Sequence, residues 1–367
     1  MSEPTLEAVR EALSGVVDPV YDKPMLEIGT LKDLGVEGAT VQVTAVLASP
    51  SDALRDQVRE RVQDALSGLG AKLALAFETR VPTREVMGDD PIPGVRNVIL
   101  VMSGKGGVGK STTAVNLTLA LKSMGLRVGL LDADIYGPSI PTMMGVSGHP
   151  VSKDGKRISP LERFGVSMMS IGFLLEDETQ AIVWRGPMLH GALQQFLKDV
   201  DWGELDYLVL DLPPGTGDVA LTMAQQLKVT GVVMVTTPQE VALQDVYKSV
   251  SMCAKLNLPI LGVVENMSWF IDTAGVKHDL FGSGGGQKVA DFAKAPLLAQ
   301  VPIEPQVREW GDKGMPVVQS RPDSEVSQAF RAAAEALAET VAKAHFARTG
   351  GEKAPPDKGP MRLKIVR

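Results

Sequence analysis

Cysteine is almost absent from this chain, whose 367 residues include one, Cys253. A single thiol excludes an internal disulfide framework and limits each chain to one thiolate ligand for a metal. Long apolar runs are missing too, and none approaches the roughly 20 residues with which a helix crosses a bilayer. The histidines show no spacing typical of a metal site; they are His149, His190, His278 and His345.

Basic charge is also scarce. The formal net charge is −7 and the isoelectric point lies near 5.3, which argues against nucleic acid or an anionic membrane as a main partner. The N-terminus is acidic and has no apolar signal-peptide core, so we expect a cytoplasmic protein. Hydrophobic residues make up 44% of the chain, enough for a substantial core in one or two domains.

Apolar patterns divide the chain into segments. Residues 1–82 predict a small α/β domain with strands at 40–47 and 72–77, and the turn-rich residues 83–95 predict a linker. From 96 to 346, short apolar runs alternate with helical patterns, which predicts an α/β fold with a mainly parallel sheet flanked by helices. Its strands are expected at 97–102, 127–132, 166–171, 206–211, 231–236 and 259–264. Residues 347–367 are expected to form a disordered tail.

The most informative motif is the glycine-rich segment Gly104–Ser111, which matches G-x-x-x-x-G-K-[ST] between an apolar run and a helical pattern. Its glycines let backbone N–H groups turn toward a phosphate, and the following helix adds its positive N-terminal end. Lys110 is expected to reach the β- and γ-phosphates, and Ser111 to ligate Mg²⁺. The expected nucleotide-binding residues here are Gly104, Lys105, Gly106, Gly107, Val108, Gly109, Lys110, Ser111 and Thr112. The chain is therefore predicted to bind a nucleoside triphosphate.

Carboxylates follow two of the apolar runs, where the strands of an open α/β sheet end at its ligand-binding edge. Asp211 is expected on the Mg²⁺ side of the nucleotide opposite Ser111, with Asp132 as a further metal residue. Asp134 is expected to orient the attacking water and so to act in catalysis together with Lys110. Beyond Asp211, the backbone N–H of Gly215 is expected to sense the γ-phosphate.

A second lysine, Lys105, directly follows the first glycine and resembles the deviant Walker A motif of the MinD/ParA/Mrp class. The resemblance implies a homodimer in which Lys105 contacts the nucleotide of the other subunit and so acts in catalysis. Four segments look like the Mrp/ApbC branch, described as ATP-dependent iron–sulfur cluster carriers or scaffolds: Leu131–Pro141, Trp184–Met188, Asp211–Asp218 and Glu265–Ser268. The match runs from about 95 to 340.

This resemblance implies a P-loop NTPase fold, ATP and Mg²⁺ as cofactors, and iron–sulfur apoproteins or assembly factors as partners. It also implies that Asn266 recognises adenine, since its amide can donate and accept at the N6/N7 edge. The first 80 residues are similar to a small domain shared with other iron–sulfur assembly factors, with Asp18–Val20 and Gly29–Leu31 at its signature positions.

The chain departs from that family where many members carry a C-x-x-C pair, because Ile271–Gly275 contains no thiol. A [4Fe–4S] cluster normally takes four thiolates, whereas a homodimer of this chain offers only its copies of Cys253. That residue lies on the apolar side of an amphipathic helical pattern and is expected to be buried. Any cluster would need non-standard ligation, for which Asp272, His278 and Asp279 offer oxygen and nitrogen atoms.

Three hypotheses follow. The first is a homodimeric ATPase of low turnover in iron–sulfur cluster assembly or transfer. The second is a nucleotide-switched interaction protein of the ParA/MinD kind; it calls for a basic patch or a C-terminal amphipathic helix, and the basic residues 359–367 are too few for one. The third is an ATP-dependent adaptor that holds no cluster itself. Sequence does not separate the first from the third.

Overall fold

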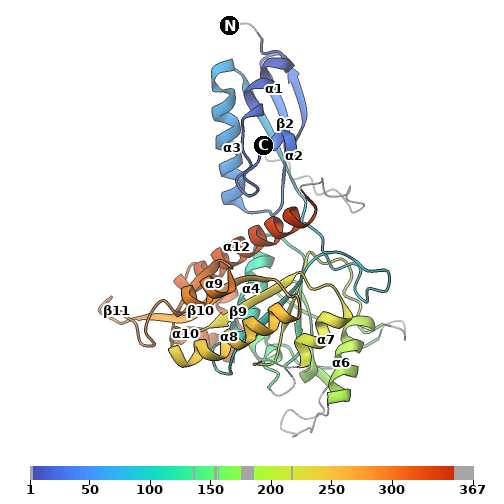
Figure 1. Cartoon of the computed structure of the whole chain (residues 1–367), viewed down its shortest axis with the longest axis vertical. Coiled ribbons are helices and arrows are strands. Elements are labelled where there is room, and N and C mark those ends of the chain that lie inside the picture. The colour runs from blue at the N-terminus through green and yellow to red at the C-terminus, as the bar shows by residue number, and fades with distance from the viewer. Residues whose placement is uncertain are drawn as a thin grey trace. The chain divides into compact units, whose positions relative to one another are not determined.

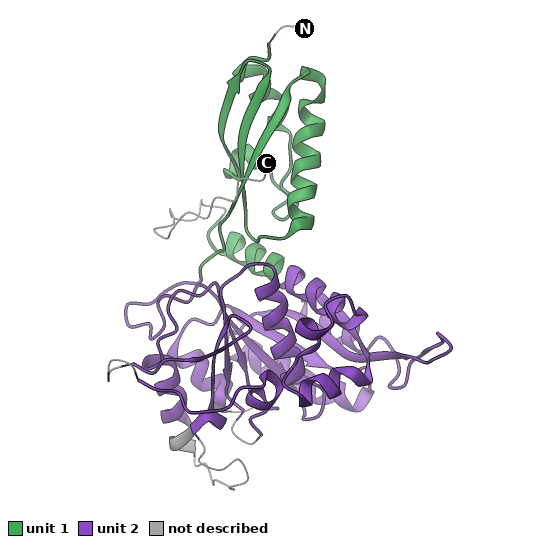
Figure 2. Cartoon of the chain, turned by 180° about the vertical axis from the view of Figure 1, so that it is seen from behind, with its two compact units in different colours: residues 1–83, 338–367 green, residues 84–337 purple. Residues whose placement is uncertain are grey.

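The computed structural model describes residues 3–134, 137–152, 155, 157–174, 186–215 and 218–350. The chain forms two compact units, which Figures 1 and 2 show. The smaller comprises residues 1–83 and the chain from Ala338 onward, and the larger comprises Arg84–Leu337. Helix α12 (Glu325–Arg348) contributes to both units. The turn-rich segment from Arg84 to Val95 groups with the larger unit.

Three helices of the smaller unit pack on a three-stranded sheet of order β1-β2-β3. Its elements are α1 (Leu6–Ser14), α2 (Met25–Ile28), β1 (Leu31–Glu37), β2 (Thr40–Leu47), α3 (Asp52–Leu66), a 3₁₀ turn (Ser67–Leu69) and β3 (Lys72–Thr79). The β1–β2 pair is antiparallel and the β2–β3 pair parallel. Val41 of β2 and Val58 of α3 are fully buried, and burial of each side chain contributes about 1.5–3 kcal/mol to the stability of the fold.

The C-terminal part of α12 completes this smaller unit. Ala342 belongs to its hydrophobic core, and Phe346 stacks on Tyr21 with ring centroids 4.6 Å apart. Burial, with a smaller effect of the Asp18 charge, raises the pKa of Tyr21 to about 12. The Arg348 guanidinium donates to the Thr83 carbonyl at 3.1 Å. The small domain is therefore built from both ends of the described chain.

A nine-stranded sheet of order β11-β10-β9-β4-β8-β5-β7-β6 forms the larger unit, with β12 paired to β10. The strands are β4 (Val98–Ser103), β5 (Val128–Asp132), β6 (Leu161–Arg163), β7 (Val166–Ser170), β8 (Tyr207–Asp211), β9 (Gly231–Thr236), β10 (Ile260–Ile271), β11 (Lys277–His278) and β12 (Leu297–Ile303). Among the described strands of this larger sheet, only β6–β7 and β10–β11 pair antiparallel. The mainly parallel sheet predicted from the sequence is confirmed.

Helices flank this sheet, as Figure 1 shows. They are α4 (Lys110–Ser123), α5 (Ile140–Met144), α6 (Gly186–Lys198), α7 (Asp218–Gln226), α8 (Glu240–Lys255), α9 (Gly285–Ala293), α10 (Pro305–Asp312) and α11 (Val317–Ser320), with a 3₁₀ turn (Ile171–Leu174) after β7. The central strands β4, β5, β8 and β9 are buried along their whole length, as expected for parallel strands covered on both faces. Within the described ranges, no helix is both long and apolar enough to cross a membrane.

Candidate nucleotide site

The glycine-rich loop joins the end of β4 to the start of α4, at the carboxyl edge of the sheet. Gly107 and Gly109 have φ angles of 79° and 84°, a left-handed conformation that side chains disfavour. A Cβ at Gly104 would lie 2.3 Å from the Val246 nitrogen, and one at Gly109 would lie 2.0 Å from Asn266 Nδ2. The loop thus approaches α8 and β10 so closely that these positions admit only glycine.

Lys110 projects from the first turn of α4 into a cluster of predicted site residues. Its ammonium Nζ lies 2.6 Å from Asp211 Oδ1, 3.4 Å from Asp134 Oδ2 and 3.3 Å from Ser111 Oγ. The side chains of Lys110, Asp134 and Asp211 are 7%, 11% and 0% exposed. Residues from β5, α4 and β8 therefore meet at one buried point, as their places at strand ends predicted.

Asp211 carries the feature that points most directly to a cation. Burial raises the pKa of this carboxyl, while the Lys110 charge and hydrogen bonds from Lys110 and Ser111 oppose the shift. Its Oδ2 atom is buried and has no hydrogen-bond partner in the described part of the chain. An orphaned carboxylate oxygen beside a serine hydroxyl offers the hard oxygen donors that Mg²⁺ prefers. Ser111 and Asp211 therefore fit this ion.

Asp132, at the end of β5, is occupied by the protein itself. Its Oδ1 accepts the Asp134 N–H at 3.1 Å, and its Oδ2 accepts the Ile140 N–H at 3.3 Å and the Ser170 hydroxyl at 2.9 Å. Burial, strengthened by the nearby Asp211 charge, raises the pKa of Asp132 to about 7. Its metal role remains a prediction.

Two further predicted residues contact the loop itself. The Asn266 amide Nδ2 donates to the Val108 carbonyl at 2.9 Å, which ties β10 to the loop. The Gly215 N–H donates to the Ser103 carbonyl, also at 2.9 Å. Their contacts with adenine and γ-phosphate remain predictions.

Lys105 lies in the same loop and is half-buried. Its side chain has no ion pair or hydrogen bond within the described residues. No described residue of its own chain thus engages the Lys105 ammonium, and its catalytic role remains a prediction.

Thiol chemistry is not available at the surface. Cys253 lies in α8 with no exposed surface, its Sγ is 3.9 Å from Met102 Sδ, and burial raises its pKa to about 11. The predicted core position of this residue is confirmed. In the hairpin between β10 and β11, His278 Nε2 lies 2.7 Å from Asp272 Oδ2, and this hydrogen bond lowers the pKa of Asp272. No group of three potential metal ligands is found among the described residues.

Two buried polar residues escaped the sequence analysis. Glu265 is fully buried and accepts the Gly286 N–H and, at 2.7 Å, the Gln300 amide; its place directly before Asn266 was the available signal. No sequence signal pointed to Ser170, because a serine at a strand end is common. The motif residues Ile135, Tyr136, Trp184, Arg185, Thr216 and Gly217 lie outside the described residues.

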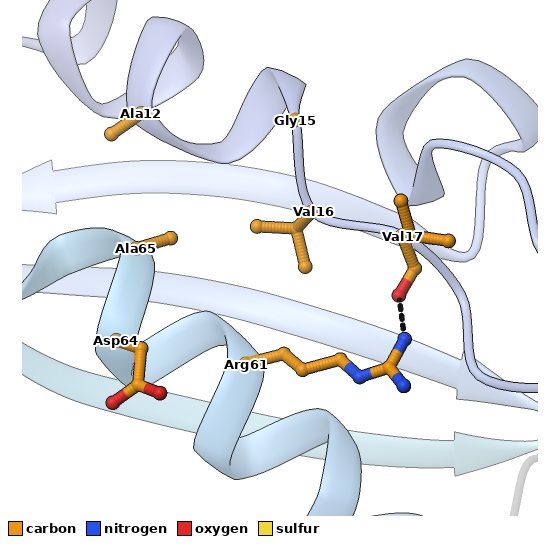
Figure 3. A pocket seen from close by; sticks show the side chains of 7 residues that line it. All are labelled: Ala12, Gly15, Val16, Val17, Arg61, Asp64 and Ala65. Carbon is orange, nitrogen blue, oxygen red and sulfur yellow. Dashed lines mark hydrogen bonds between the residues drawn. The ribbon is translucent and has the colours of Figure 1, made fainter.

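A shallow cleft of about 440 Å³ lies between α1 and α3 in the smaller unit (Figure 3). The Arg61 guanidinium reaches across it and donates to the Val17 carbonyl at 2.8 Å. Apolar residues such as Val16 and Ala65 line most of it. It contains no residue expected to bind nucleotide or metal.

These features together define a P-loop NTPase: a glycine-rich loop between a strand and a helix, a buried lysine between strand-end carboxylates, and a mainly parallel sheet. The fold agrees with that of the cell division ATPase MinD from Pyrococcus furiosus, with a TM-score of 0.50 and 23% identity over 66% of this chain and 98% of that one.

The sequence identifies a narrower family within this class. Residues 94–338 match the model of the NUBPL iron-transfer P-loop NTPases, and residues 6–73 match that of an iron–sulfur cluster assembly protein. The chain belongs to this family of iron-transfer P-loop NTPases, which confirms the resemblance inferred from its motifs.

Known relatives extend over nearly the whole chain. An iron–sulfur cluster carrier protein from Synechocystis is 44% identical and covers 93% of this chain and 99% of its own length. One from Escherichia coli K12 is 51% identical, over 90% of this chain and 92% of its own. A nucleotide-binding protein from Archaeoglobus fulgidus, solved with ADP, has a TM-score of 0.55 and 38% identity over 63% of this chain and 92% of that one.

Proposed function

We propose that this protein is a homodimeric Mg²⁺-ATP hydrolase of low turnover that acts in iron–sulfur cluster assembly or transfer. One observation carries the ATPase part: the buried Lys110 ammonium lies between Asp211 and Asp134, beside an orphaned carboxylate oxygen. The cluster part is supported by relatives that are named iron–sulfur cluster carriers. Iron–sulfur apoproteins or assembly factors are the corresponding partners.

Each residue has a task in this proposal. The backbone N–H groups of Gly104–Thr112 surround the phosphates, and Lys110 exchanges part of its pairing with carboxylates for the β- and γ-phosphate oxygens. Ser111 and Asp211 hold Mg²⁺, which neutralises phosphate charge when bound. Asp134 orients the attacking water by accepting its hydrogen bond. Asn266, already beside the loop, contacts adenine, and the Gly215 amide reports the γ-phosphate.

Lys105 supports the homodimer. A half-buried ammonium without a partner in the described chain is available to a second nucleotide site. Supplied across an interface, it stabilises charge that develops on the transferred phosphate, as an arginine finger does. Hydrolysis then depends on association of two subunits.

A second candidate, an ATP-dependent adaptor that holds no cluster itself, is favoured by one observation. The sole thiol of the chain, Cys253, is buried in the core. A cluster handled by this protein would be cargo that takes its sulfur ligands from a partner protein or a small thiol. The ATP site is the same in both candidates.

Two measurements on the full-length protein test the proposal. Phosphate release at saturating Mg²⁺-ATP, compared with Lys110→Ala, tests the hydrolase. Anaerobic reconstitution with iron and sulfide, followed by iron counting per dimer, separates the carrier from the adaptor. A wild-type protein with no turnover above the variant would refute the ATPase assignment, and a stable cluster in stoichiometric amount would exclude the adaptor.

A further inference from the structure

The Asp132 carboxylate holds the backbone at Asp134 and at the start of α5. Asp132 Oδ1 accepts the backbone N–H of Asp134, and Asp132 Oδ2 accepts that of Ile140, where α5 begins. The residue between the two aspartates, Ala133, donates its N–H to the Asp211 carbonyl at 2.9 Å. The backbone that leads to Asp134 is thus held from β5 and from β8.

Ser170 orients this carboxylate. It lies opposite Asp132 in the β5–β7 register, and its hydroxyl accepts the Gly172 N–H at 3.0 Å. The hydroxyl proton therefore remains for Asp132 Oδ2, which lies 2.9 Å away. Ser170 and Asp132 are both fully buried, so water does not compete for this hydrogen bond.

Asp132 differs from Asp134 and Asp211 in the groups that its carboxylate contacts. Asp134 and Asp211 both reach the Lys110 ammonium, whereas Asp132 has no ion pair with it in the described chain. Both Asp132 oxygens accept protein donors, whereas Asp211 Oδ2 accepts none within the described residues. Asp132 is therefore directed to the backbone and to Ser170 rather than to the ligand.

We propose that Asp132 and Ser170 are positioning residues, which hold Asp134 where it orients the attacking water, and that Asp132 does not ligate the metal. This inference rests on the proposed hydrolase function. Displacement of a reacting group by about 1 Å can cost on the order of a hundredfold in rate. Loss of one hydrogen bond in the support should have a smaller effect, and it should act on turnover rather than on binding.

The test uses Ser170→Ala in the full-length protein, with Ser167→Ala in the same strand as matched control. Ser167 is half-buried and lies opposite Gly129 in the β5–β7 register, three residues before Ser170. We expect Ser170→Ala to lower kcat by roughly tenfold, with KM for ATP and the Mg²⁺ concentration at half-maximal rate within about threefold of wild type. The control should change neither. Asp132→Asn and the double variant should be equally slow, because residues that act as one unit are not additive.

Amide hydrogen exchange gives a readout that does not need turnover. In Ser170→Ala and Asp132→Asn, the N–H groups of Asp134 and Ile140 should exchange faster than in wild type or the control. An unchanged kcat in Ser170→Ala, or a Mg²⁺ requirement raised tenfold or more by Asp132→Asn alone, would overturn the positioning role. A wild-type protein without ATPase activity would instead refute the proposed function.

Discussion

Replacing Lys110 by alanine perturbs the nucleotide site at its centre. The ammonium lies 2.6 Å from Asp211 Oδ1 and 3.4 Å from Asp134 Oδ2, so it neutralises two carboxylates that are nearly or fully buried. Phosphate oxygens that enter the wild-type loop meet a cation already in place. In the variant they meet two uncompensated negative charges.

The size of the effect follows from these distances. At about 4 Å and an effective dielectric constant near 20, one pair of unit charges contributes about 4 kcal/mol. Because Lys110 gives up part of its pairing with the carboxylates, we expect a net loss of about 3 kcal/mol, or somewhat over a hundredfold in Kd. Removal of one partner from a buried ion pair also lowers the free energy of unfolding by about 3–5 kcal/mol.

Calorimetric titration with Mg²⁺-ATP measures the first effect and denaturant unfolding the second. Lys105→Ala is the control: it removes a lysine from the same loop that is half-buried and has no side-chain partner in the described chain. With Mg²⁺-ADP, its Kd should stay within about threefold of wild type (~0.7 kcal/mol). A Lys110→Ala protein that binds Mg²⁺-ATP within the same threefold would refute the reasoning.

The remaining predictions concern turnover, association and the thiol. Asp134→Asn should slow hydrolysis by at least about tenfold while Mg²⁺-ATP binds as tightly as in wild type or more so, because the lost carboxylate competes with phosphate for Lys110; unchanged steady-state turnover would move its role elsewhere. In the wild type the ATPase rate per subunit should rise with protein concentration, and in Lys105→Ala it should be flat; a concentration-independent wild-type rate would contradict the dimer. Cys253 is fully buried with a pKa raised to about 11, so at pH 8 it should react with a thiol reagent only as fast as the protein unfolds. A chelator-resistant cluster that is lost in Cys253→Ser would show that this thiol is accessible and binds the cluster.

Sequence patterns predicted the elements whose physical signal is local. The fully buried strands β4, β8 and β9 are continuous apolar runs, and each is close to its predicted bounds. Strand β1 was missed because Asp33 adopts a φ of 54° within a register shift, which breaks the alternation of buried and exposed residues. Strand β12 was missed because Gln300 and Pro302 interrupt its apolar run.

The contacts at the site also differ in whether the sequence could predict them. Strand-end carboxylates in a parallel sheet lie at one edge whatever the strand order, so the meeting of Asp211 with Lys110 followed from the motifs. The bond from Ser170 to Asp132 spans 38 residues and exists only because β7 is the neighbour of β5. Strand order of this kind is set by the packing of the whole sheet. The contact of Ser170 with Asp132 therefore could not be predicted from the sequence.

Two groups expected to touch the nucleotide are bound within the protein. The Gly215 N–H donates to the Ser103 carbonyl and the Asn266 amide to the Val108 carbonyl, each at 2.9 Å. A ligand that takes either donor must first displace a hydrogen bond, which costs about 0.5–1.5 kcal/mol net. The contribution expected from phosphate contacts at Lys110 is larger than this cost. Asn266 also stands at the register break between β10 and β12, from which β10 continues into the hairpin with β11. A nucleotide that takes the Asn266 amide would therefore release the tie between the loop and β10 just before this hairpin.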